Sequence, residues 1–396
     1  MASSKAAPLY LTADRIPASQ GYVPSLDGLR ALSILFVMVG HLVSGRLAPG
    51  GLGVQVFFVI SGFLIARLML AEHKADGAVS LPRFYLRRFL RLYPVTLIYS
   101  LAVVGVFLAA GLAFHWGELF SVLGYYSNYY YLWYEQVHPG TPDLPFGIFW
   151  SLAVEEHFYL LFPPLFLLLR GRADRLFWTM AVVCAGGLVA RLVAGSLDPQ
   201  LIVSRALYYR TEFRIDAIAW GVLLAAACET DWGRRLIAAL GHPLAFAVGL
   251  AGLTSTFILR DDFFRETWRY SLQGASLFVL FAGLLFSARY RLIQQALNLS
   301  PITWIGRLSY SLYVWHLCTP DLSRWAMPDG GWAAQTIFQF ALSFALAALS
   351  YYGLEQPLAR WRRRLGGVKA PGAALRPADQ SLTREPTQAE ASAAAV

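Results

Sequence analysis

The sequence predicts an all-α polytopic membrane protein with about ten transmembrane helices and both termini in the cytoplasm. Three observations predict this class. The 396 residues are 57% hydrophobic and only 14% charged, whereas a soluble protein of this length carries roughly 25% charged residues. Apolar stretches recur near the ~20 residues that cross a hydrocarbon core. Lysine and arginine gather in alternate short loops, as they do on the cytoplasmic side of membrane proteins.

Ten apolar segments are expected to span the bilayer. In chain order they are 30–47, 53–71, 94–114, 148–169, 176–195, 212–229, 242–259, 271–288, 302–320 and 335–354. The first of them is short and the fourth is polar for a span. We divide the chain into a cytoplasmic N-terminal segment at 1–25, a membrane domain at 26–365 and a cytoplasmic tail at 366–396. The tail is rich in Ala, Pro and polar residues, a composition that favours disorder.

The distribution of basic residues orients the segments. The 72–93 loop carries five of them and the 170–175 loop three, whereas the long 115–147 loop has none. Positive loops face the cytoplasm, so an even number of spans places both termini there. The net charge of +9 is therefore attributed to loops that face anionic lipid, and no nucleic-acid partner is expected.

Arg30 and His41 are ionisable residues inside the first segment. Eleven residues make close to three turns of 3.6, so the two side chains share a helix face about 16 Å apart. We expect Arg30 at the cytoplasmic mouth and His41 near mid-membrane, where ionisable groups usually line a cavity or pathway. A structural His on a backbone carbonyl and an Arg that only anchors the helix are the alternatives. Because a neutral imidazole suits a general base near pH 7, His41 is a candidate catalytic residue.

Arg87, Arg88 and Arg91 lie on about one helical turn within residues 83–94. One interpretation is that they anchor the helix to lipid headgroups. The other is a phosphate clamp, since arginine binds phosphate oxygens bidentately. Coenzyme A combines a phosphorylated head with a long thin arm that would run beside Arg30 towards the first-segment imidazole. A molecule of this shape would be a donor substrate, and we expect no permanently bound cofactor.

Glu155 and Glu156 occupy the fourth segment, one turn after Trp150 and Ser151. Glu155 could orient an imidazole, act as a base or bind a sugar hydroxyl, and is a candidate catalytic residue. Interfacial carboxylates in contact with water are the alternative. Trp150 and Ser151 are candidate substrate contacts.

Two later clusters add further candidates. Arg214 and Asp216 begin the sixth segment and could form either a structural ion pair or part of a ligand site. Ser309, Tyr313 and His316 follow one another at about one-turn spacings, so they share a helix face, and His316 is a second buried imidazole. We take Arg214, Asp216, Tyr313 and His316 as candidate substrate-binding residues. The cysteine and histidine spacings suggest no metal site.

These clusters, in this order, resemble the acyltransferase-3 family of membrane O-acyltransferases over about residues 20–365. Each short element is weak alone, but six in order are specific. The matching residues are Arg30 and His41; Arg87, Arg88 and Arg91; Trp150, Ser151, Leu152, Glu155, Phe158 and Tyr159; Arg214, Asp216 and Gly221; Ser309, Tyr310, Tyr313 and His316; and Glu355 and Pro357. At His157 a Gln is frequent in the family. Pro357 is expected to end the tenth span.

The resemblance implies an enzyme that moves an acyl group, often acetyl, from cytoplasmic acyl-CoA to a carbohydrate hydroxyl. Family acceptors include O-antigen, exopolysaccharide, peptidoglycan, lipo-oligosaccharides and macrolide sugars. Some members carry an extra SGNH esterase-like domain outside the membrane. We expect this chain to lack it and to act alone or with a separate periplasmic acyl-carrier or glycan-export partner.

In the expected mechanism the phosphates of CoA bind to Arg87, Arg88 and Arg91, and Arg30 guides the donor inward. His41 would act as general base or as a nucleophile that forms an acyl-imidazole, and Glu155 would orient His41 or the acceptor. Three alternatives stay open: acylation of a small glycoside such as a macrolide sugar, a transporter with an intramembrane His/Glu relay, and a scaffold of a glycan-export machine.

Overall fold

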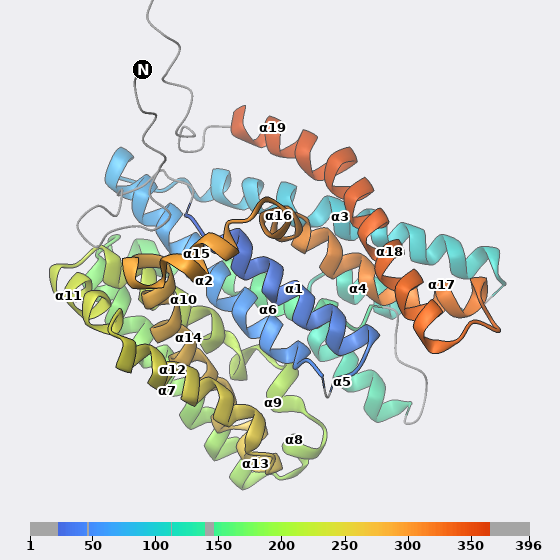
Figure 1. Cartoon of the computed structure of the whole chain (residues 1–396), viewed down its shortest axis with the longest axis horizontal. Helices are drawn as coiled ribbons and strands as arrows, with labels where there is room; N and C mark the ends of the chain where they lie inside the picture. Colours follow the sequence, from blue (N-terminus) through green and yellow to red (C-terminus); the bar gives the residue numbers. More distant parts are fainter. Residues whose placement is uncertain (1–22, 46, 112, 139–145, 365–396) are drawn as a thin grey trace, which may run out of the picture.

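The computed structural model describes residues 23–45, 47–111, 113–138 and 146–364, and every regular element in these ranges is helical (Figure 1). The larger helices are α1 (Leu26–Leu42), α2 (Gly50–Asp76), α3 (Leu81–Ala109), α6 (Phe149–Leu168), α7 (Ala173–Leu197), α10 (Ile215–Cys228), α12 (Pro243–Ile258), α14 (Trp268–Phe286), α16 (Ser300–Trp315) and α18 (Trp332–Ser350). The connecting helices are α4 (Trp116–Leu123), α5 (Ser127–Val137), α8 (Gln200–Val203), α9 (Ala206–Tyr209), α11 (Asp231–Leu240), α13 (Asp262–Glu266), α15 (Arg291–Leu297), α17 (Thr319–Ala326) and α19 (Gln356–Arg364). The expected tail at 366–396 and most of the segment 1–25 lie outside the described residues.

Six helices are long and apolar enough to cross a membrane, and up to seven if the bent pair α11 and α12 counts as one span. The six are α2, α3, α6, α7, α14 and the continuous helix Trp332–Arg362. The chain is therefore a multi-pass membrane protein. Each of the ten predicted segments overlaps a helix, but ten spans and the cytoplasmic position of both termini are not confirmed.

Besides α12, which counts as a possible span only together with α11, three predicted spans are helices too short to cross a bilayer alone. Helices α1, α10 and α16 have 17, 14 and 16 residues, which at 1.5 Å per residue is about 21–26 Å, against a hydrocarbon core of ~30 Å. Helix α10 packs against α2, α7 and α14, and α1 packs against α2 and α16. Twelve of the 14 residues of α10 are buried, as expected for a helix that is apolar all round. Helix α10 thus lies inside the bundle, whereas α1 also carries exposed apolar side chains at Leu32 and Phe36.

The crossing of α2 and α10 depends on two glycines. A Cβ on Gly62 would lie 1.9 Å from the carbonyl oxygen of Ile218, and a Cβ on Gly221 would lie 1.9 Å from that of Val59. The two backbones therefore touch, which only glycine allows, and small residues at helix contacts are typical of membrane bundles. This close approach is the physical reason for the glycine in the 214–221 element.

Replacing Gly221 by valine is expected to destabilise the protein, because the new side chain meets a backbone carbonyl that cannot rotate away. Overpacking of this kind costs about 1–3 kcal/mol when the neighbours are side chains, and more is expected here. The measurements are the monodisperse yield in detergent and the melting temperature. Gly105→Ala and Gly186→Ala are matched controls, since a Cβ there meets nothing within 4 Å. Equal stability of Gly221→Val and the controls would contradict the close crossing.

The prediction that Pro357 ends the tenth span is wrong. Helix α18 continues through a π-helical turn at Tyr351–Glu355 into α19, in which Pro357 is the second residue. Proline is tolerated in a first helical turn, where its missing N–H is not needed. The π turn, a feature frequent at functional sites, places Glu355 beside Ser311 on α16, whose hydroxyl donates to it.

Candidate active site

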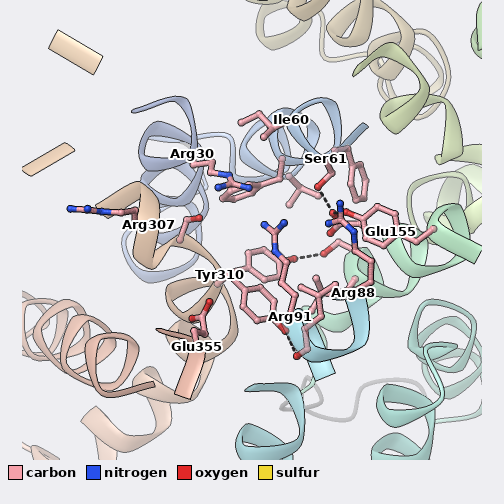
Figure 2. A pocket seen from close by; sticks show the side chains of 18 residues that line it. Arg30, Ile60, Ser61, Arg88, Arg91, Glu155, Arg307, Tyr310 and Glu355 are labelled. Carbon is pink, nitrogen blue, oxygen red and sulfur yellow. Dashed lines mark hydrogen bonds between the residues drawn. The ribbon is translucent and has the colours of Figure 1, made fainter. Parts of the chain in front are cut away.

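A cavity of about 100 Å³ lies between α1, α2, α3, α6 and α16 (Figure 2). Its walls include Arg30 from α1, Arg88 and Arg91 from α3, and Arg307 from α16. In Figure 2 the side chains of Arg30 and Arg91 point towards the interior from two sides, whereas Arg307 points outward. Basic residues that are far apart in the sequence therefore share one cavity.

Two carboxylates line the same cavity, and both are held by hydroxyl groups. Glu155 accepts hydrogen bonds from Ser61 on α2 and from Tyr159 one turn along α6. Glu355 accepts from Ser311. Because these contacts join α2 to α6 and α16 to the π turn, each carboxylate is fixed in place before any ligand binds.

The guanidinium groups outnumber these carboxylates. Arg30 pairs with Asp27 at 3.6 Å. Arg88 is buried, with its guanidinium 4.7 Å from the ring centroid of Tyr159. Within the described ranges, neither Arg88 nor Arg91 forms an ion pair. A cavity with this excess of guanidinium groups suits an anion with several oxygens, such as a phosphate.

A second cavity of about 330 Å³ adjoins the first, because Arg30, Arg91, Arg307 and Glu355 line both. It adds Arg362 from α19. Helix α19 runs along the upper edge of the bundle in Figure 1. The larger cavity therefore extends from the arginine cluster towards that edge.

His41 and His316 form a direct pair between α1 and the end of α16. The Nδ1 atom of His41 lies 2.9 Å from Nε2 of His316. The ring centroids are 5.2 Å apart and the planes differ by 10°, which fits an in-plane hydrogen bond better than stacking of the ring faces. His316 is fully buried, whereas His41 is exposed in the last turn of α1. The position of His41 near mid-membrane stays a prediction; within its helix, His41 lies in the last turn, close to the C-terminal end.

The backbone around His316 decides where the protons lie. Its Nδ1 is 2.8 Å from the carbonyl oxygen of Tyr313 and 3.2 Å from that of Leu312. Since a carbonyl oxygen only accepts, Nδ1 of His316 carries the hydrogen, and its Nε2 is the acceptor when the ring is neutral. His41 must then donate through Nδ1, which leaves its own Nε2 with a free lone pair. This assignment follows from the hydrogen-bond pattern.

Tyr313 connects the cavity with the histidine pair. It lines the cavity, its ring centroid is 5.9 Å from that of His316, and its hydroxyl lies 2.5 Å from Oγ of Ser151. Ser151 also lines the cavity. Neither His41 nor His316 is a lining residue, so Tyr313 and Ser151 mark the end of the cavity nearest to the pair.

Two other expectations change in the structure. The residue that contacts His41 is His316, whereas the hydrogen-bonding partners of Glu155 are Ser61 and Tyr159. Arg87 pairs with Glu72 at 2.8 Å and does not line either arginine-rich cavity. The three-arginine element therefore divides: Arg88 and Arg91 face the cavity, and Arg87 ties α3 to α2.

In the sixth-segment cluster, Arg214 and Asp216 do not pair with each other, although such an ion pair was one of the two alternatives for these residues. Asp216 is 1% exposed and forms a bidentate contact with Arg191 of α7, with nitrogen–oxygen distances of 2.7 and 3.0 Å. Arg214 instead donates to Gln55 at 2.9 Å. Trp150 packs against Tyr208, with ring centroids 4.6 Å apart. This burial argues against direct substrate contact for Asp216.

Sequence reasoning missed Arg191, Arg307 and Ser61. Arg191 and Arg307 stand inside apolar helices, and an arginine at such a position is itself a signal of a buried partner or a cavity. Ser61 gives no such signal, since a serine in a membrane helix is ordinary.

Comparisons with known proteins show which family and which relatives the chain is similar to. Residues 23–352 match a family model described as an acyltransferase domain. The chain is 30% identical over 362 residues to the peptidoglycan O-acetyltransferase OatA of Listeria monocytogenes. The aligned region covers 86% of this chain and 56% of that protein. It is 28% identical over 361 residues to the O-acetyltransferase OatA of Staphylococcus aureus, covering 86% of this chain and 58% of that protein. The chain thus spans little more than half the length of these relatives. No solved structure matches it.

Proposed function

The chain belongs to the acyltransferase-3 family, and we propose that it transfers an acyl group, acetyl in the first instance, from acyl-CoA to a hydroxyl group of a cell-surface carbohydrate. The observation that carries this proposal is the oriented histidine pair beside an arginine-lined cavity. The printed names of the relatives, O-acetyltransferase and peptidoglycan O-acetyltransferase, support acetyl as the group and a surface glycan as the acceptor. The bacterial inner membrane is the proposed location.

In this proposal the donor binds in the two adjoining cavities. The larger cavity near α19 receives the phosphates of acyl-CoA on Arg91, Arg307 and Arg362. The thin pantetheine arm follows Arg30 and Arg88 into the smaller cavity, so that the thioester reaches the end marked by Ser151 and Tyr313. Glu155, held by its two hydroxyl donors, positions this end of the arm.

His41 then activates the acceptor. Its free Nε2 takes the proton of the sugar hydroxyl while the hydroxyl oxygen forms a bond to the thioester carbonyl carbon. The carbon–sulfur bond breaks, and the CoA thiolate leaves and recovers the proton from the imidazolium. In a covalent variant the same lone pair attacks the thioester carbonyl carbon, the carbon–sulfur bond breaks and the CoA thiolate leaves. The sugar hydroxyl then takes the acyl group from Nε2, the nitrogen–carbon bond breaks, and the hydroxyl proton passes to the thiolate. In both versions His316 holds His41 in the productive tautomer.

Release of free CoA from acetyl-CoA tests the proposed function directly. Purified full-length protein incubated with radiolabelled acetyl-CoA and a candidate glycan is expected to release free CoA and to label the glycan. Transport or a scaffolding role would consume no acetyl-CoA. Absence of acceptor-dependent CoA release across peptidoglycan fragments, acidic oligosaccharides and a macrolide glycoside would overturn the proposal.

Replacing Arg91 by alanine is expected to raise the KM for acetyl-CoA about 10- to 100-fold, since a charge-assisted contact contributes about 1.5–3 kcal/mol. Arg87→Ala is expected to change this KM little, because Arg87 pairs with Glu72 outside the cavity. Arg83, exposed one turn earlier on α3, provides the matched control Arg83→Ala. Steady-state kinetics at saturating acceptor measure all three. An unchanged KM in Arg91→Ala, or equal effects in all three variants, would contradict a phosphate clamp.

A further inference from the structure

A third cavity, of about 600 Å³, lies between the start of α2, α9 and the α12–α14 corner. Its lining residues include Gly45, the tyrosines Tyr208 and Tyr270, and the arginines Arg205, Arg260, Arg265 and Arg269. Helices α8, α9 and α13 lie along the lower edge of the bundle in Figure 1, opposite α19. Gly45, in the wall, follows His41 by four residues. This cavity is therefore at the His41 end of α1, away from the proposed donor phosphates.

The walls of this cavity carry four arginines and no carboxylate. Arg265 pairs with Asp262 at 3.2 Å and Arg269 with Glu266 at 3.6 Å. Arg205 and Arg260 form no ion pair in the part of the chain that the structure describes. The cavity therefore has an excess of positive charge.

Aromatic rings combine with these charges. The guanidinium of Arg205 lies 4.9 Å from the ring centroid of Tyr208, and that of Arg269 lies 4.9 Å from the ring centroid of Tyr270. Both tyrosines line the cavity. Tyrosine rings pack on sugar faces, and arginine binds carboxylate or phosphate oxygens, so the walls combine two elements that suit an acidic carbohydrate.

A buried cation beneath these rings adds to the positive field. Arg214 is fully buried, with its guanidinium 3.9 Å from the ring centroid of Tyr270 and 5.2 Å from that of Tyr208. Its Nη2 donates to Gln55, but Nε and Nη1 have no hydrogen-bonding partner. A buried charge with free donors is costly, and an anion bound near the two tyrosines would lower that cost through the low-dielectric interior.

We propose that this cavity binds an anionic group, a carboxylate or a phosphate, of the carbohydrate acceptor, and that the acceptor is therefore an acidic glycan. The inference rests on the proposed function, because only acyl transfer makes the bound carbohydrate an acceptor. It deepens that function by naming the class of substrate. Anchoring by the acidic group would hold a neighbouring sugar hydroxyl at the end of α1 that carries His41. Arg205, Arg260 and the two tyrosines would then determine acceptor specificity.

Direct binding tests this site without turnover. The full-length protein in phosphatidylcholine nanodiscs is titrated with trigalacturonate, glucose 6-phosphate and neutral maltotriose. We expect at least one acidic probe to bind about tenfold or more tightly than maltotriose, and to weaken as salt shortens the screening length from ~10 Å at 0.1 M to ~3 Å at 1 M. The probe that binds identifies a carboxylate or a phosphate. Failure of both acidic probes to bind, or equal binding of maltotriose, overturns the proposal.

Variants locate the binding. The double variant Arg205→Gln/Arg260→Gln is expected to lose about tenfold or more in affinity for the acidic probe, since it removes two charge-assisted contacts to the anion. Both side chains are exposed, so the fold should tolerate the change, and a melting curve checks this. Arg235→Gln, at an exposed arginine of α11, is the matched control. Unchanged affinity in the double variant overturns the proposal.

Two further outcomes separate this inference from its alternatives. If phosphatidylglycerol in the nanodisc displaces the acidic probe in the wild-type protein but not in the double variant, the cavity is a lipid headgroup site and the proposal is overturned. If the acidic probe binds through Arg205 and Arg260 but no acceptor gives CoA release, the anion site stands and the acyltransferase proposal fails.

Discussion

Replacing His41 by alanine is expected to lower acetyl transfer about 100- to 10,000-fold, the range that a positioned general base contributes. The physical reason is the free lone pair on Nε2, which the hydrogen bond from Nδ1 to His316 leaves available. Because His41 is exposed at the end of α1, its loss should not unfold the protein. The measurement is acceptor-dependent CoA release at saturating acetyl-CoA.

Three readouts make this result specific. The variant should keep the wild-type KM for acetyl-CoA and the wild-type elution volume in detergent, because His41 does not line the donor cavity. Mass spectrometry of the wild-type protein, quenched after incubation with acetyl-CoA and no acceptor, separates the two mechanisms. An acetyl group on His41 supports the nucleophile, and its absence supports the general base. Undiminished acetyl transfer in His41→Ala would exclude both.

Replacing Arg191 by methionine is expected to destabilise the protein by about 3–5 kcal/mol, the cost of leaving a buried charge without its partner. Arg191 is fully buried and joins Asp216 of α10 to the carbonyl oxygens of Phe213 and Thr267. Its removal leaves the carboxylate of Asp216 uncompensated at the contact of α7, α10 and α14. A lower melting temperature and a lower folded yield measure the effect.

The matched control removes both charges. Arg191→Met/Asp216→Leu is expected to recover most of the lost stability, since an apolar pair of similar size often replaces a buried ion pair without loss. Tyr270, whose ring lies 5.6 Å from the Arg191 guanidinium, remains to pack against the new side chain. A double variant no more stable than the single one would show that the hydrogen bonds of Arg191, rather than its charge, dominate.

Part of the site was predictable because it depends on one helix at a time. The spacing of Arg30 and His41 places both on α1, and Arg30 does line the cavity. The turn spacing of Tyr313 and His316 likewise places them together at the end of α16. The family could be recognised from six short elements, and the family model covers the same region.

The errors arise where a residue has a choice of partners. Arg214 is two residues from Asp216, yet Asp216 pairs with Arg191 across α7, because the helix directs the two neighbouring side chains differently. Arg87 and Arg88 are adjacent, yet one faces Glu72 and the other the cavity. The count of ten spans stays a prediction, because α1, α10 and α16 are shorter than a typical span and their position in a bilayer depends on the neighbouring helices.

The sequence by itself determined the helical membrane class, the family and the placement of Arg30 and His41 on one helix, because composition and the 3.6-residue period are local properties of the chain. Only the tertiary structure decided that His316, 275 residues away, orients His41. It also decided which arginines share a cavity and which glycines let α2 and α10 touch. These depend on how helices cross, and a crossing is set by packing between distant segments that no local pattern encodes.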